Sequence, residues 1–140
     1  PASDGEPLTF QVDTGTNTDF NIVVTNSFFR ARHNEGDTIS SLAYVTSYDQ
    51  AQGTAFIRMN GGVGNGNDEC CSMILTIYEP ASSTFVKHYT FTGNNYQDNS
   101  GSENLFSAGY FNTTTALTRI QFKMGSGNID SGTIKMYGIT

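Results

Sequence analysis

The chain has 140 residues, of which 14% are charged and 12% aromatic, and its formal net charge is −6 with a sequence pI near 4.6. This length predicts one domain, residues 1–140, large enough to bury a hydrophobic core. The acidic balance argues against binding to nucleic acid or to an anionic membrane, and no apolar stretch reaches the roughly 20 residues of a membrane span.

Apolar and polar residues alternate through the first part of the chain with the period of two that is typical of β-strands. Leu8 to Val12 is the first such run, Phe20 to Val24 the second and Phe28 to Arg32 a third. Ile39 to Tyr48 and Ala55 to Met59 follow. Turn-forming Asp, Asn and Gly residues separate these runs, so we expect short antiparallel strands.

The middle of the chain predicts two long loops and two strands. Asn60 to Glu69 is too rich in glycine for a regular element. Ser72 to Tyr78 is apolar on both faces, which predicts a central strand covered on both sides. Phe85 to Phe91 predicts the next strand, and Gly93 to Glu103 a second polar loop.

The last part of the chain ends in strands. Leu105 to Phe111 is a short strand or a helical turn, and Leu117 to Met124 is a strand with Ile120, Phe122 and Met124 facing inward. Ile134 to Thr140 predicts a final strand held in a sheet, since a chain end otherwise frays. Eight or nine short strands without a convincing helix predict an all-β fold, a single antiparallel β-sandwich of jelly-roll type.

The surface composition and the first residue bear on the kind of protein. A charged fraction of 14% is low beside the ~25% of an ordinary soluble domain, so Asn, Ser, Thr and Gln must cover the surface. This is typical of extracellular and virion proteins and of tight oligomers. Pro1 fits removal of an initiator Met, so we expect the chain to be a complete small gene product.

The sequence carries no signature of an enzyme. His33 and His88 are its only histidines; His88 lies within a predicted strand, and His33 stands beside arginines without a neighbouring carboxylate to orient it. No nucleophile motif is present. The glycines between Gly61 and Gly66 lack the Lys and the helix of a phosphate-binding loop. We therefore expect neither catalysis nor a cofactor.

The two predicted loops are the candidate binding sites. Asn65, Asn67 and Asp68 in the first loop and Asp98 in the second offer oxygen ligands of the kind that Ca²⁺ prefers, although neither loop matches a calcium motif, and we expect no metal. Tyr96, among Asn and Asp residues, has the composition of a glycan-binding loop. Ordinary exposed loops share both compositions.

Cys70 and Cys71 are adjacent in the sequence. A bond between neighbours would need a strained ring, and their side chains point to opposite faces of a strand. We expect one buried and one half-exposed thiol; the alternative is a disulfide between subunits.

The C-terminal sequence, Ile120-Gln121-Phe122 followed by Gly127 to Ile139, resembles the end of many tailed-bacteriophage virion proteins. Those proteins end in Gly-Asn, an apolar residue, a Gly-Ser/Thr pair and Leu-Tyr-Gly-Ile. Ile129 stands where that family often has an aromatic residue, and Met136 where it often has Leu. The family consists of β-sandwich domains in capsid-associated proteins, minor structural proteins and tail-fibre modules.

The resemblance implies a non-enzymatic protein of the virion surface. We expect a capsid decoration, or cement, protein that stabilises the phage head as a homotrimer, with the major capsid protein shell as its partner. Arg30 and Arg32 would dock on an acidic shell, and Tyr137 and Ile139 would lie in an interface. The alternative is a receptor- or glycan-binding module of a fibre, knob or tail, whose two polar loops contact a host-surface glycan.

Overall fold

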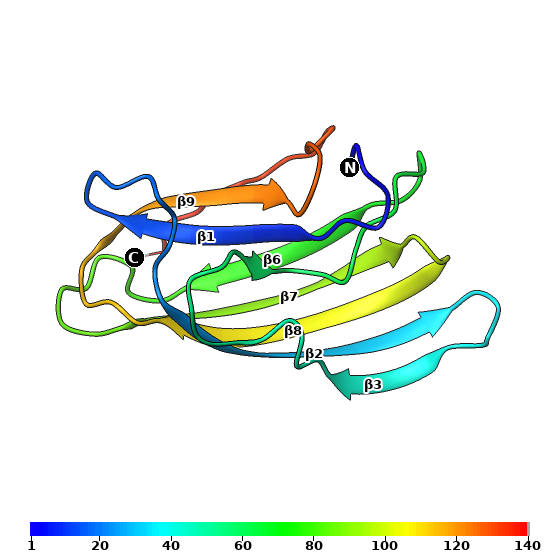
Figure 1. Ribbon diagram of the computed structural model, residues 1–140, viewed down its shortest axis with the longest axis horizontal. Coiled ribbons are helices and arrows are strands. Elements are labelled where there is room, and N and C mark those ends of the chain that lie inside the picture. The colour runs from blue at the N-terminus through cyan, green and yellow to red at the C-terminus, as the bar shows by residue number, and fades with distance from the viewer. Residues whose placement is uncertain (140) are drawn as a thin grey trace.

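The computed structural model describes residues 1–139, which form nine β-strands in two antiparallel sheets and no helix. The predicted all-β sandwich is confirmed (Figure 1). The strands are β1 (Leu8–Thr14), β2 (Val24–Asn34), β3 (Ser40–Tyr44), β4 (Gln50–Gly53), β5 (Ile57–Arg58), β6 (Cys71–Ile77), β7 (Lys87–Gln97), β8 (Gly101–Phe111) and β9 (Leu117–Met124). Within this part of the chain there is no helix of the length and apolarity that a membrane span requires.

The two sheets differ in width. The narrow sheet has the strand order β5-β1-β9, and the wide sheet has the order β3-β2-β8-β7-β6, with β4 added to β2. The first strand pairs with the last and the second with the last but one, and this nesting is the jelly-roll feature of the fold. Two consecutive hairpins join β6, β7 and β8.

The core lies between the sheets and is centred on Phe10 of β1. This ring makes edge-on contacts with Tyr89 at 5.4 Å, Phe111 at 6.2 Å and Phe91 at 6.5 Å, all from the wide sheet. All four side chains are buried. Edge-to-face pairs contribute about 0.5–1.5 kcal/mol each beyond the burial of apolar area, so these contacts fix how one sheet lies on the other.

The connection between β1 and β2 depends on a buried carboxylate. Asp13 accepts backbone hydrogen bonds from Thr14 at 2.8 Å and from Phe20 at 3.0 Å. Phe20 has a φ of +48°, so the predicted run from Phe20 is interrupted, and β2 begins only at Val24. Burial by itself raises the pKa of Asp13, but the backbone N–H groups and Arg119 outweigh that effect and hold the pKa below 3.8.

Two predictions about the wide sheet were wrong. β6 is an edge strand, not a central one, and Ile74 on it is 70% exposed. The predicted loop from Gly93 to Glu103 shrinks to Asp98–Ser100, because β7 and β8 continue toward each other as a long hairpin. The segment from Leu105 therefore belongs to a strand, while the irregular loop from Asn60 to Glu69 is confirmed.

The predicted C-terminal strand was also wrong. Residues 129–139 lie outside both sheets, and Thr140 lies outside the described residues. The segment turns back after β9 and, in the view of Figure 1, passes behind β9 toward the opposite end of the sandwich. Its apolar side chains are exposed, with 87% of Met136 and 95% of Ile139 open to solvent. The β-forming sequence is present, but no strand of the same chain pairs with it.

Candidate functional site

The outer face of the wide sheet is the side that points away from the narrow sheet. Its side chains alternate along each strand with the buried ones, and register pairs bring them into rows across the sheet. None of them is Asp, Glu, Lys or Arg. They are Thr25, Ser27, Phe29, Ala31 and His33 of β2; Ser40, Leu42 and Tyr44 of β3; Ser72, Ile74 and Thr76 of β6; His88, Thr90, Thr92, Asn94 and Tyr96 of β7; and Ser102, Asn104, Phe106, Ala108 and Tyr110 of β8.

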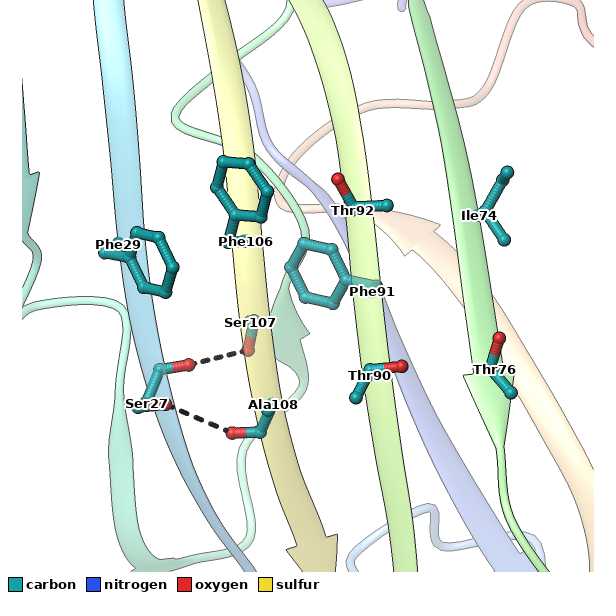
Figure 2. Close-up of a pocket in the computed structure, with 10 residues that line it drawn as sticks. All are labelled: Ser27, Phe29, Ile74, Thr76, Thr90, Phe91, Thr92, Phe106, Ser107 and Ala108. Atoms are coloured by element: carbon teal, nitrogen blue, oxygen red, sulfur yellow. Dashed lines mark hydrogen bonds between the residues drawn. The ribbon is translucent and has the colours of Figure 1, made fainter.

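One row of this outer face is largely apolar. Pairing places Tyr44, Phe29, Phe106, Thr92 and Ile74 in line across all five strands. The Phe29 and Phe106 rings are stacked, with centroids 5.0 Å apart and planes within 11° (Figure 2). A shallow depression of about 400 Å³ lies beside them and extends to Ile74. The row is thus an exposed apolar strip.

Uncharged hydrogen-bonding groups flank the strip. Ser27, Thr76 and Thr90 line the depression on one side (Figure 2). The Ser27 hydroxyl donates to the Ala108 carbonyl at 3.4 Å, and the hydroxyl of Thr90 lies 3.3 Å from that of Tyr78. Desolvating hydroxyl groups costs far less than desolvating charges, so this face can be covered by a partner at low cost.

Charged groups stand only around the margin of this face. The Tyr44 hydroxyl donates to Asp49 at 2.6 Å and the Tyr96 hydroxyl to Glu35 at 3.1 Å. His33 lies 3.0 Å from Asp37, a carboxylate that sequence reasoning had not assigned to it. These acids come from turns rather than from the sheet.

Arg30 does not lie on an open docking patch. Its side chain faces the opposite side of β2 and forms an ion pair with Glu103, which is fully buried. Glu103 also accepts a hydrogen bond from the backbone N–H of Gly61 at 2.9 Å. The guanidinium of Arg30 lies 5.3 Å from the centre of the Tyr48 ring. Arg30 therefore holds the loop after β5 against the wide sheet.

Arg32 is similarly engaged. It is half-buried, and its Nε donates to the Gln97 side chain at 2.9 Å. The predicted basic patch of Arg30 and Arg32 was wrong in its placement, because alternation along β2 turns both side chains to the inner side. Neither group is presented to an acidic shell.

The candidate binding loops come together at one end of the sandwich. Asn95 donates to the Gly62 carbonyl at 2.9 Å, which joins β7 to the loop after β5, and Asn65 donates its backbone N–H to Asp4 at 3.1 Å. Asp98 packs against Gly5 in the same region. Asn67 and Asp68 are exposed.

The described residues contain no group of three or more His, Cys, Asp or Glu side chains arranged to hold a metal ion. Asn65 and Asp98 each face the N-terminal segment by separate contacts. The loops therefore share an end of the molecule but do not form one ligand set.

The cysteines and the remaining histidine are separate from one another. Cys70 is exposed and Cys71 half-buried, and neither forms a disulfide, so the expected pair of one buried and one half-exposed thiol is not found. Burial and then the neighbouring Cys70 raise the pKa of the Cys71 thiol. His88 is exposed and lies 6.1 Å from the ring of Tyr110.

The predicted interface residues of the tail are free of their own chain. Tyr137 is 77% and Ile139 is 95% exposed, and no hydrogen bond involves residues 131–139 within the described part of the chain. Comparison of the sequence and the structure with protein-family models, curated proteins and solved structures finds no match.

Sequence reasoning missed the uncharged outer face, although the signal was present. Every second residue from Thr25 to His33 and from His88 to Tyr96 is uncharged, and the charged residues of these two strands, Arg30, Arg32 and Lys87, fall on the other register. The overall charge content was noted, but its uneven distribution between the two faces of a strand was not.

Proposed function

We propose that the protein is a non-enzymatic virion surface protein, a capsid decoration protein that acts as a homo-oligomer. The observation that carries the proposal is the uncharged outer face of the wide sheet. Monomeric proteins rarely expose contiguous apolar patches larger than a few hundred Å², and interface cores are depleted of charge and enriched in aromatic residues. The stacked pair of Phe29 and Phe106 fits that composition.

The size of this face supports a protein partner. The outer face uses β2, β7 and β8 of 11 residues each, β6 of 7 and β3 of 5. With a rise of about 3.3 Å per residue and strands about 4.8 Å apart, it covers roughly 700 Å². A standard interface buries about 800 Å² on each partner. One such face is therefore large enough to hold the protein on a shell of capsid subunits.

The resemblance of the C-terminal sequence to tailed-phage virion proteins supplies the virion part of the proposal. In the proposed mechanism, copies joined to one another bring several outer faces onto neighbouring shell subunits. The joined copies then oppose separation of those subunits, because each must lose its contacts at the same time.

Immunogold electron microscopy of phage particles that carry this sequence tests the proposal. Label over the head surface is expected, together with a lower temperature of head rupture once the protein is removed. Particles without label, or heads that rupture at an unchanged temperature, contradict a decoration role.

A second candidate function is a glycan-binding module of a fibre or tail, and one observation favours it. Phe29 and Phe106 lie beside the hydroxyls of Thr90 and Thr92, and aromatic faces beside hydrogen-bonding groups suit sugar rings. A glycan array separates the two candidates. Binding that is lost in Phe106→Ala but kept in Gln121→Ala supports the glycan module, and gold label at the tail agrees with it.

A further inference from the structure

The edge of β6 is a sheet edge without protection. β6 ends the wide sheet, and its sequence, Cys71–Ile77, contains neither charge nor proline. Natural edge strands are usually blunted by charges, prolines or bulges, because open N–H and C=O groups invite another strand. The free edge of β9 carries Arg119 and Lys123, both exposed. β3, at the other end of the wide sheet, also lacks charge and proline, but its five residues are all exposed. β6 is therefore the uncharged edge that has partly buried side chains beside it, and it is the edge suited to receive a strand.

The core beside β6 is incompletely covered. Met73, Leu75 and Ile77 point toward the interior yet are only half-buried, whereas Tyr89, next to them on β7, is 1% exposed. One more strand along β6 would cover these side chains. It would also extend the apolar strip beyond Ile74 on the outer face.

The C-terminal tail, residues 132–139, has the properties of that strand. It is extended, β-forming in sequence and unpaired, and its apolar side chains include Ile134, 64% exposed, and Met136, 87% exposed. Seven residues from 133 to 139 match the seven of β6. Alternation would place Ile134 and Met136 on one face and Tyr137 and Ile139 on the other.

The beginning of the tail is fixed to its own body. Ala2 donates a hydrogen bond to the Asn128 carbonyl at 3.1 Å, and the N-terminal amine lies 3.8 Å from Asp130. Beyond this anchor, Gly132 has a φ of +144° with open space around it, and the following residues make no hydrogen bond within residues 1–139. The tail is thus an arm that is anchored at its beginning and exposes its apolar side chains as far as Ile139.

We propose that the C-terminal tail of one copy adds as a β-strand to the free edge of β6 in a second copy, so that copies are joined by exchanged arms. This inference rests on one part of the proposed function, that the protein is a homo-oligomer, and adds how its copies are joined. The inference states which segments join two copies. It does not depend on which surface the assembled protein binds.

The apolar area of the tail agrees with this occupant. A side chain of this size offers on the order of 150–250 Å², so Ile134, Met136, Tyr137 and Ile139 at their exposed fractions offer roughly 600 Å². Each docked tail covers a similar area of its partner. Because alternate side chains of an added strand stay on the outer face, about half of this area, roughly 300 Å² per tail, is buried. Together with the matching area of the partner, two exchanged tails bury roughly 1,200 Å² of side-chain surface, which is the lower end of the range for specific interfaces.

Truncation after Ser131 is the first test. Light scattering on a sizing column should show an oligomer for the full chain and a monomer for the truncated chain, with self-association weakened by on the order of a hundredfold. The truncated chain should keep its thermal midpoint when both are compared as monomers at high dilution, since the removed residues make no hydrogen bond to the body. Met136→Lys should act like the truncation and Lys135→Ala should not. A full chain that is monomeric at micromolar concentration overturns the proposal.

Cross-linking identifies the joint even where a variant folds poorly. In a background with Cys70→Ser and Cys71→Ser, one chain carries Ser72→Cys on β6 and a differently tagged chain carries Lys135→Cys on the tail. A bismaleimide should give a mixed dimer of intermediate size, and no mixed dimer overturns the proposal. The double variant Ser72→Cys, Lys135→Cys should likewise link between chains, and a link only within one chain also overturns it. Gold labelling of particles that carry the truncated chain distinguishes the two proposals. If tail exchange is wrong but the decoration role is right, the label on the head persists although the oligomer experiments fail.

Discussion

Replacing Arg30 by Ala should strongly destabilise the fold, because Glu103 would remain buried without its cation. Glu103 is 0% exposed and would keep only the Gly61 N–H as a hydrogen-bond donor in this ion-pair cluster. Breaking a buried ion pair by removing one partner costs about 3–5 kcal/mol. Arg30 is itself 18% exposed, so water can enter the vacated space and the lower end applies. Loss of its contact with Tyr48 adds about 0.5 kcal/mol.

The expected loss is therefore about 3–4 kcal/mol in the free energy of unfolding, measured by urea denaturation followed by circular dichroism. For 140 residues, an unfolding entropy of about 2.1 cal/mol/K per residue converts this loss into a fall of roughly 10–14 °C in the melting temperature.

Arg32→Ala is the matched control for this experiment. Arg32 lies two residues further along β2, and its partner Gln97 is neutral, so the expected loss is about 0.5–1.5 kcal/mol. Adding Glu103→Leu to Arg30→Ala should recover part of the stability, since the unpaired charge is then gone. Equal losses in Arg30→Ala and Arg32→Ala, or a loss below about 1 kcal/mol in the former, would refute the buried ion pair.

Three further predictions concern the face, the acid response and the thiols. Thr92→Lys should change the free energy of unfolding by less than about 0.5 kcal/mol but should weaken binding to purified capsids, measured by co-sedimentation, at least about tenfold. Gln121→Lys on β9 should leave both stability and binding unchanged. Equal binding by both variants would show that the outer face is not the interface. The lowered pKa of Asp13 lies below its unfolded value, so its stabilisation is present above pH 3.8 and is lost as the pH falls through the folded pKa. Urea midpoints should therefore fall more steeply between about pH 5 and 2.5 in the wild type than in Asp13→Asn, and parallel curves would contradict this. Cys70 should react with Ellman's reagent at least about tenfold faster than Cys71, whose thiol pKa is raised; a single fast phase of two thiols would disagree.

The sequence was sufficient for those elements whose apolar positions alternate clearly. β9 begins and ends where predicted, with Phe122 facing the core ring of Phe10. Alternation reports which side of a strand is apolar, and in a two-layer fold that side must face the other layer. The sandwich follows from this periodicity and from the frequent turns.

Local composition was insufficient to predict strands whose existence or position depends on pairing with distant parts of the chain. Asn94 and Asn95 suggested a loop, yet both lie in β7, where Asn94 faces Asn104 across the hairpin and donates to Ser102 at 2.8 Å. β-propensity depends on the neighbours across the strand, which composition does not give. The same holds for β6, whose place at an edge is set by the order of the whole sheet.

The site was harder to predict than the fold because it consists of missing charges rather than of a motif. Arg30 and Arg32 attracted attention as a basic cluster, but position along the strand decides whether a charge is displayed or used internally. The even-numbered positions of β2 face inward, so the guanidinium groups of Arg30 and Arg32 make contacts within the fold. The uncharged side chains at the odd-numbered positions form the outer face.

The pairing of β1 with β9 has a consequence for how the chain is made. The Thr9 hydroxyl donates to the Lys123 carbonyl at 2.8 Å across 114 residues of sequence. Contacts of such separation raise the contact order and slow folding. The entropy cost of closing a long loop must be met before the contacts that stabilise it can form. During synthesis, Phe10 must therefore wait for nearly the whole chain before its sheet can form. The hairpins of β6, β7 and β8 are local, so these three strands can assemble first and serve as the template to which β2 and then the narrow sheet are added.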